Sequence, residues 1–446
     1  MNYTPHTKYD IDEMLNEIGL KNIDELFSQL PKELLLKDEL ELADGISEME
    51  VSTFVQTLAR KNNSFSQHPI FMGGGVYDHY IPPAVDLLSG RGEFYTAYTP
   101  YQPEASQGTL QAIIEYQTAI TRLTKMDIAN ASLYDGSTAL GEAILMSVEI
   151  SNKNEVLISS TVHPEWIDVA HSYVYGKDIN IKLINQNNGE TSINEIKSMI
   201  SPNTACVCIQ SPNFFGVIED YRELKKYLAE QDVLLVVAVY PFSLGFINPP
   251  GEWDADIVIG DGQSLGNYIS FGGPHFGFLV CKKDFIRKIP GRIVGETIDA
   301  FEQKGFCLTF QTREQHIRRE KATSNICSNQ ALMALRAIIY LSLLGEDGLK
   351  EAANLAYHKA HYLQKKICEL SAYELKFNKP FFNEFVIQSK IKPEIINKSL
   401  FDAGIIGGLS LNRFNNQYEN QILFAVTEKR TKNEMDNLVK VLQKIS

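Results

Sequence analysis

Cysteine is scarce in this sequence, with six residues among 446. Six are too few for a disulfide scaffold in a chain of this length, and Cys206 and Cys208 lack the second pair that a zinc ribbon requires. No uninterrupted apolar run approaches the roughly 18 residues of a membrane span, and the first residues are polar where a signal peptide would be apolar. We therefore expect a cytoplasmic protein with no membrane partner.

Positive charge is also in short supply, because 42 Lys and Arg face 55 Asp and Glu, for a net charge of −13. Such a chain repels nucleic-acid phosphates and anionic lipids, so we expect no nucleic-acid partner. The motifs of P-loop nucleotide sites, H-E-x-x-H metalloproteases and G-x-S-x-G hydrolases are missing. These absences leave those three classes without support, and we expect no metal site.

The first hundred residues differ in pattern from the rest. Apolar residues at helical spacing predict two short helices within residues 10–30 and another over 48–60. The segment 72–104 is rich in Gly, Pro and Tyr, where regular structure is hard to sustain. We therefore expect an N-terminal arm, residues 1–107, that is partly helical and partly irregular.

After this arm, short apolar runs alternate with helical patterns, which predicts an α/β fold with a mainly parallel sheet. A hairpin is predicted over 268–281 and one long helix over 314–344. We assign a large α/β domain to residues 108–345 and a smaller C-terminal α/β domain to 346–446.

Two segments carry side chains suited to a binding site. The first has tyrosines three residues apart, and it comprises Tyr95, Tyr98, Tyr101, Gln102 and Glu104. Tyrosines of this kind suit either a wet pocket or interface or ordinary core packing. The second segment could hold a carboxylate or phosphate, or could be a solvated helical face. It comprises Arg313, His316, Arg318, Arg319 and Lys321.

A further candidate is Asp135-Gly-Ser-Thr138, which is predicted to join a strand to a helix. Free amides at such a helix start could bind a phosphate, although the same residues could simply cap their own helix. His163 and His275 stand at predicted strand ends, where sites in α/β proteins gather.

Five blocks, residues 94–111, 260–266, 271–275, 290–295 and 311–327, closely resemble the P-protein of the glycine cleavage system, and in particular the first subunit of its two-subunit form. The resemblance covers nearly the whole chain. It implies an aspartate-aminotransferase-like fold, pyridoxal phosphate fold type I. It also implies decarboxylation of glycine, with transfer of the aminomethyl group to the lipoyl arm of the H-protein. The implied partners are subunit 2, in a heterotetramer, and the lipoylated H-protein.

The sequence departs from the family at the coenzyme. Residues 260–280 contain no lysine, and Gln263 and Ser264 stand where the catalytic subunit carries its Schiff-base lysine. Tyr240 stands where related chains have the acid that faces the pyridine nitrogen. The resemblance thus implies that this chain binds no coenzyme covalently, is inactive alone, and relies on pyridoxal phosphate held by the partner. What remains is a vestigial pocket of Ser137, Thr138, Tyr240, Gln263, Ser264 and His275.

We expect the two polar segments, 95–104 and 313–321, to support the partner's active site across an interface. A basic stretch could steer the acidic carrier protein, or could be a solvated helix. It comprises Lys282, Lys283, Arg287, Lys288 and Arg292. Two alternatives stay open: an autonomous pyridoxal phosphate enzyme that uses another lysine, and a non-catalytic scaffold or regulatory subunit.

Overall fold

The computed structural model describes residues 5–36, 40–64, 67–322 and 324–446. Contacts between residues divide the chain into two units, Met1–Asn63 and Ser64–Ser446. The domain boundaries predicted at residues 107 and 345 stay predictions. No described helix is both long and apolar enough to span a bilayer.

The first unit consists of short helices: α1 (Lys8–Glu17), η1 (Ile23–Phe27), η2 (Lys32–Leu34) and α2 (Glu48–Ala59). Capping boxes start the two α-helices, with Thr7 paired to Asp10 and Ser47 paired to Glu50. The predicted helices are confirmed, although η1 is a 3₁₀ helix. Among the described residues of this unit only Leu15 is buried, so capping contributes more to these helices than packing does.

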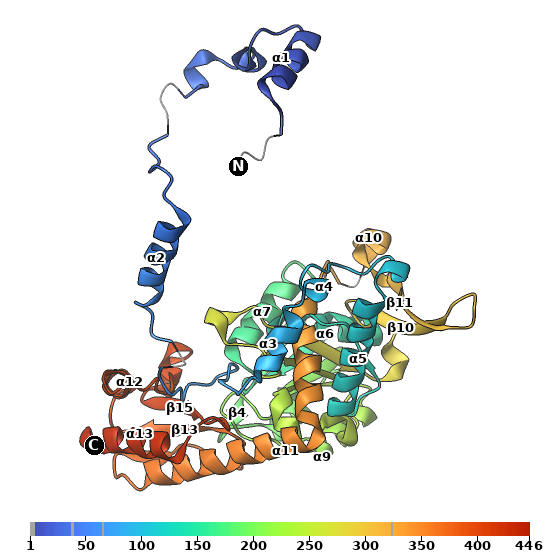
Figure 1. The fold of residues 1–446 in the computed structure, drawn as a ribbon. Coiled ribbons are helices and arrows are strands. Elements are labelled where there is room, and N and C mark those ends of the chain that lie inside the picture. Colours follow the sequence, from blue (N-terminus) through green and yellow to red (C-terminus); the bar gives the residue numbers. More distant parts are fainter. Residues whose placement is uncertain (1–4, 37–39, 65–66, 323) are drawn as a thin grey trace. The chain divides into compact units, whose positions relative to one another are not determined.

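A seven-stranded sheet forms the centre of the second unit, in the order β1-β9-β8-β7-β6-β2-β3 (Figure 1). Strands β2, β3, β6, β7 and β8 pair in parallel, whereas β9 runs antiparallel to both β1 and β8. The predicted mainly parallel sheet is therefore confirmed. The strands are β1 (Ile128–Ala129), β2 (Glu155–Ser159), β3 (Asn180–Ile184), β6 (Thr204–Gln210), β7 (Leu234–Val239), β8 (Ile257–Asp261) and β9 (Gly277–Cys281).

Helices cover both faces of this sheet (Figure 1). Side chains of β7 alternate between the faces: Val236 joins the core under α6 and α7, and Val237 joins the core under α5 and α11. Because both faces are buried, the strand needs apolar residues at every position, which explains its unbroken apolar run. The helices are α3 (Pro83–Ser89), α4 (Gly92–Tyr95), α5 (Gln107–Thr124), α6 (Gly136–Ser151), α7 (Pro164–Val174), α8 (Ile193–Met199), α9 (Arg222–Glu230) and α11 (Ala331–Cys368).

A smaller antiparallel sheet follows, in the order β12-β13-β15-β14, and packs with α12, α13 and the second half of α11. The last helix buries Met435, Leu438 and Leu442 on one face, at the spacing of an amphipathic helix. The elements are β12 (Tyr373–Leu375), β13 (Glu384–Ser389), α12 (Pro393–Asp402), β14 (Leu409–Ser410), β15 (Gln421–Ala425) and α13 (Lys432–Lys444).

Two predicted elements are wrong. The helix expected over 314–344 begins only at Ala331, bends at Gly345 (φ 63°) and continues to Cys368. Residues 311–321 form short helical turns instead, including α10 (Gln315–Arg318), which stops where Arg319 takes a positive φ of 54°. Residues with a positive φ cannot continue an α-helix, so the helix is interrupted at these two positions.

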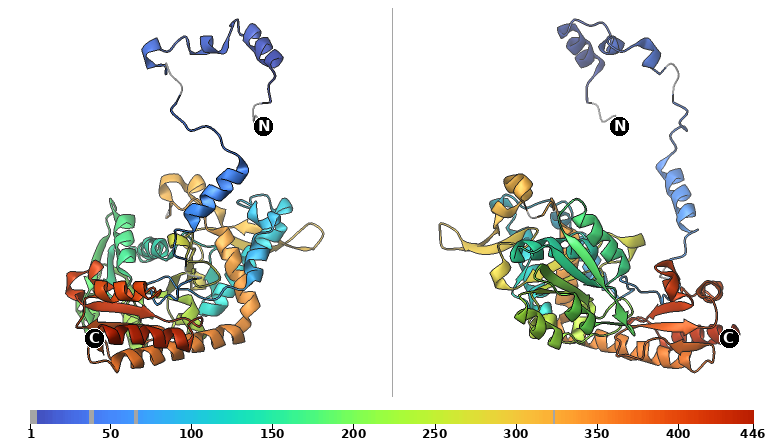
Figure 2. Two further views of the ribbon diagram at one scale, coloured as in Figure 1. Left: turned by 60° about the vertical axis from the view of Figure 1, so that its left-hand side comes forward. Right: turned by 180° about the vertical axis from the view of Figure 1, so that it is seen from behind.

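The hairpin predicted over 268–281 is also wrong, because only β9 is a strand there and it pairs with β8. The long hairpin lies further along, as β10 (Ile293–Ile298) and β11 (Lys304–Thr309), and extends away from the sheet (Figure 2). A second, minimal hairpin joins β4 (Gln186–Asn187) to β5 (Glu190–Thr191).

Candidate functional site

The first turn of α6 lies at the carboxyl edge of the large sheet, where α/β proteins place their ligands. Its N-cap residue, Asp135, accepts hydrogen bonds from the amide of Thr138 at 2.8 Å and from the hydroxyl of Ser137 at 2.6 Å. In return, the Thr138 hydroxyl accepts one from the amide of Asp135. Ser137 and Thr138 therefore cap their own helix.

A carboxylate already stands at this helix start. Asp261, at the end of β8, accepts a hydrogen bond from the amide of Gly136 at 3.0 Å. Trp166 of α7 covers the same place: a Cβ atom on Gly136 would lie 2.2 Å from its ring. Since the helix dipole favours negative charge here, Asp261 takes the position that a phosphate group would need.

Gln263 lies two residues after Asp261 and is 2% exposed. Its side chain accepts a hydrogen bond from the amide of Tyr77 at 2.9 Å and donates to the carbonyls of Tyr77 and Asn267. The Gln263 side chain thus holds the segment around Tyr77 against the sheet.

Tyr77 fills the space beside Tyr240, which ends β7. Their ring centroids are 4.2 Å apart, and the Tyr77 hydroxyl donates to Glu384 of β13 at 2.7 Å. Glu384 also accepts the amide of Gly74 at 2.6 Å. Burial raises the pKa of Glu384 to about 7, against the effect of these two hydrogen bonds. The segment 71–80 therefore lies between the large sheet and the small one.

His79 completes this packing. Its ring stacks on Phe242 with centroids 3.8 Å apart, one nitrogen bonds the Tyr240 hydroxyl, and the other lies 2.6 Å from Glu428. Burial, together with the neighbouring tyrosine and carboxylates, raises the pKa of Tyr240 well above its usual value. Sequence reasoning missed Tyr77 and His79, although both stand in the Tyr- and Gly-rich stretch that it singled out.

Ser264 and His275, the other two residues predicted for the vestigial pocket, each carry a buried polar atom without a hydrogen-bond partner in the described part of the chain. The Ser264 hydroxyl and Nε2 of His275 have no partner among the described atoms. Nδ1 of His275 lies 3.5 Å from Asp261. Although burial opposes it, this carboxylate raises the pKa of His275. Their membership of a vestigial coenzyme pocket stays a prediction.

The predicted tyrosine segment is largely solvent-exposed. Tyr95 and Tyr98 are 68% and 79% exposed, and Gln102 and Glu104 are exposed as well. Tyr101 differs, because its hydroxyl accepts a hydrogen bond from Arg292 at 3.1 Å and its ring lies under the same guanidinium. Large exposed aromatic side chains of this kind are typical of interfaces with other proteins.

The second predicted segment divides into one inward and four outward side chains. Arg313 points inward and donates to the carbonyls of Ile289, Gly291 and Phe310. Burial lowers the pKa of Arg313. The other four residues are exposed on short helical turns, namely His316, Arg318, Arg319 and Lys321.

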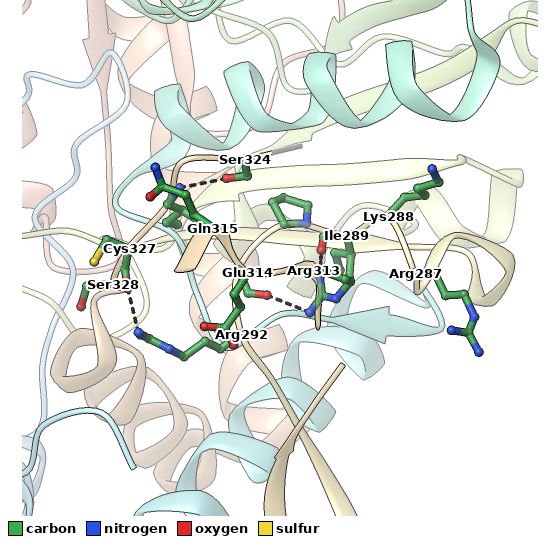
Figure 3. A pocket seen from close by; sticks show the side chains of 13 residues that line it. Arg287, Lys288, Ile289, Arg292, Arg313, Glu314, Gln315, Ser324, Cys327 and Ser328 are labelled. Atoms are coloured by element: carbon green, nitrogen blue, oxygen red, sulfur yellow. Dashed lines mark hydrogen bonds between the residues drawn. The ribbon is translucent and has the colours of Figure 1, made fainter. Parts of the chain in front are cut away.

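The predicted basic stretch does not form one exposed patch. Lys282 pairs with Asp254 at 2.7 Å and Asp256 at 2.8 Å, and Lys288 pairs with Glu149 at 2.6 Å. Arg292 is buried, which leaves Lys283 and Arg287 as the exposed members. Arg292, Arg313 and Cys327 instead line one small cavity (Figure 3).

Comparison with protein families gives a match over residues 1–442 to the family described as glycine cleavage system P-protein. The chain belongs to the P-protein family. A relative from Carboxydothermus hydrogenoformans, called probable glycine dehydrogenase (decarboxylating) subunit 1, is 50% identical over 99% of both chains. One of the same name from Desulforamulus reducens is 47% identical over the full length of both.

Solved structures agree with this membership. An inhibitor-bound P-protein, glycine decarboxylase of the glycine cleavage system, covers both chains completely with a TM-score of 0.91 and 41% identity. The sphingosine-1-phosphate lyase of Burkholderia pseudomallei shares the fold at 14% identity and a TM-score of 0.66. The fold of this P-protein family member is therefore that of the fold type I pyridoxal phosphate enzymes, as the sequence predicts.

The residues where the resemblance implies the coenzyme do not fit pyridoxal phosphate. An internal carboxylate takes the helix start, Tyr77 fills the space beside Tyr240, and residues 260–280 supply no lysine. Nor does any described group of His, Cys, Asp and Glu have the arrangement of a metal site.

Proposed function

We propose that this chain is the non-catalytic subunit of a two-subunit glycine decarboxylase. Subunit 2 would hold the pyridoxal phosphate, whose protonated ring stabilises the charge left when glycine loses CO₂. The lipoylated H-protein would then accept the aminomethyl group. Six free cysteine thiols are compatible with a reducing cytoplasm.

The observation that carries this proposal is the pocket filled by the chain's own residues. A coenzyme site needs an amine for the Schiff base, donors for a phosphate and room for a ring. In this proposal Gln263 stands in place of the amine. The amide of Gly136 at the helix start donates to Asp261 instead of a phosphate, and the Tyr77 ring occupies the space of the coenzyme ring. Because these contacts are buried and mutually bonded, they stabilise the fold without a coenzyme.

The exposed tyrosines are the part of this chain best suited to the partner subunit. Tyr95 ends α4, and Tyr98 follows in an irregular segment, so both rings stand clear of the core. The exposed residues of 316–321 add donors for a carboxylate or phosphate. We propose that both segments support the partner's active site across the interface between the subunits, in a heterotetramer.

Reconstitution tests the proposal. Release of CO₂ from labelled glycine is measured for this chain, for subunit 2 and for their mixture, each with H-protein and pyridoxal phosphate. We expect activity only in the mixture. Turnover by this chain alone would establish an autonomous enzyme, and equal rates for subunit 2 alone and the mixture would establish a mere scaffold.

Two substitutions test the tyrosine segment within the reconstituted complex. Tyr95→Ala and Tyr98→Ala should each lower CO₂ release by about tenfold or more, because small errors in positioning are costly in catalysis. Assembly, measured by size-exclusion chromatography, should be unchanged. Tyr175→Ala is the matched control, since Tyr175 is 90% exposed at the end of α7. Wild-type rates in both segment variants would remove this segment from the proposal.

A further inference from the structure

A small cavity of about 40 Å³ lies among residues 287–292, 313–315 and 324–328 (Figure 3). The carbonyl of Pro290, one of its lining residues, accepts a hydrogen bond from Asn130, which follows β1. Its wall includes Arg287, Lys288, Arg292 and Arg313, against a single carboxylate, Glu314. A cavity of this size has room for a few water molecules or for a carboxylate or phosphate group. The concentration of positive charge is unusual in a chain of net charge −13.

Arg292 belongs to this wall and is 8% exposed. It donates to the carbonyl of Cys327 at 2.7 Å and to the hydroxyl of Tyr101 at 3.1 Å. Its Nε is buried and has no hydrogen-bond partner, and none of the ion pairs among the described residues involves Arg292. A buried charge without a counter-charge is costly, so this arginine needs an anion.

The neighbouring charges do not supply that anion. Arg313 meets only main-chain carbonyls, and Lys288 is already paired with Glu149. Glu314 is the one carboxylate of the wall; it lies 3.5 Å from Nδ1 of His316, and no ion pair among the described residues joins it to Arg292. At least one positive charge in the cavity is therefore left without compensation.

We propose that this cavity binds a small oxyanion, a carboxylate or a phosphate group, through Arg292. Arginine presents several donors in one plane and suits both groups, and its free Nε already lies in the buried wall. The inference concerns binding by this chain alone. Its test is therefore independent of the test of the proposed partnership with subunit 2.

The thiol of Cys327 gives a local measurement on the full wild-type chain, because it is exposed and lines the cavity. Its alkylation by iodoacetamide is followed by peptide mass spectrometry in inorganic phosphate, in acetate, and in NaCl of equal ionic strength. We expect phosphate or acetate to slow the reaction about threefold or more, because a bound anion shields the thiol and disfavours its thiolate. The half-buried Cys368 serves as the internal reference.

The two anions distinguish the sources: slowing by phosphate alone indicates a phosphate ester group, and slowing by acetate as well indicates a carboxylate. Arg292→Gln should abolish the effect and Arg292→Lys should weaken it. Arg222→Gln, at an exposed arginine of α9, should leave it unchanged. If NaCl slows the alkylation of Cys327 in the wild-type chain as much as phosphate and acetate do, the proposal is wrong; this result does not depend on whether the variants fold. Full protection of Cys327 by the anions in a folded Arg292→Gln chain would also overturn it.

Discussion

Glu384 makes the stability of the chain depend on pH in a direction opposite to that of an ordinary salt-bridged acid. Burial raises its pKa in the folded state from 4.5 to about 7. Between those values the folded chain binds a proton that the unfolded chain releases. Stability from this group is therefore fully present below about pH 4.5 and is lost as the pH rises through 7.

The magnitude follows from the two pKa values. A shift of about 2.5 units corresponds to about 3.4 kcal/mol, of which about 2 kcal/mol is lost between pH 5.5 and 8.5. Glu384→Gln removes the titration but keeps an oxygen for the Gly74 amide and places an NH₂ group beside the Tyr77 hydroxyl. Relative to the wild type, this variant should gain about 2 kcal/mol over that range.

The assay is urea unfolding followed by circular dichroism at several pH values, with the wild type and the variant side by side. Glu374→Gln is the control, since Glu374 is an exposed carboxylate on β12 of the same small sheet. We expect Glu374→Gln to follow the wild-type slope and Glu384→Gln to show a flatter one. Identical slopes for Glu384→Gln and the wild type would refute the reasoning, and so would a steeper slope.

Two further substitutions test the local structure. Gly136→Ala should destabilise the chain by about 1–3 kcal/mol, because its Cβ would lie 2.2 Å from the Trp166 ring; an unchanged melting temperature would contradict the packing described. Thr431→Ala should cost about 1 kcal/mol by removing the N-cap of α13, whereas Thr53→Ala, an exposed threonine inside α2, should not; equal effects would argue against the cap.

Much of the fold follows from local sequence signals. The apolar run 233–239 is one of the short runs that predict strands, and β7 lies within it, buried on both faces. The capping box of Thr431 and Glu434 at the start of α13 is another such local signal. The prediction of a helix beginning at residue 314 is wrong, because nothing in this charged stretch marks where a helix starts or stops. In the structure Phe310 and Arg319 have positive φ, which interrupts regular helix there.

The candidate site was predictable only in part. The missing lysine could be read directly from residues 260–280, because it concerns one short stretch. The filling of the pocket could not, because Tyr77 lies 186 residues from Gln263 and 307 from Glu384. Contacts across such separations depend on how the two sheets meet, and spacing along the chain does not reveal it. The cavity around Arg292 and Cys327 depends on the fold in the same way.

The central claim is that the coenzyme amine belongs to the partner subunit, and borohydride trapping tests it most directly. The reconstituted complex is reduced with borohydride in the presence of pyridoxal phosphate, and both subunits are digested and analysed by mass spectrometry. The account predicts a pyridoxyl-lysine only in peptides of subunit 2. A stoichiometric adduct on this chain, for example at Lys359, whose pKa burial lowers, would contradict it.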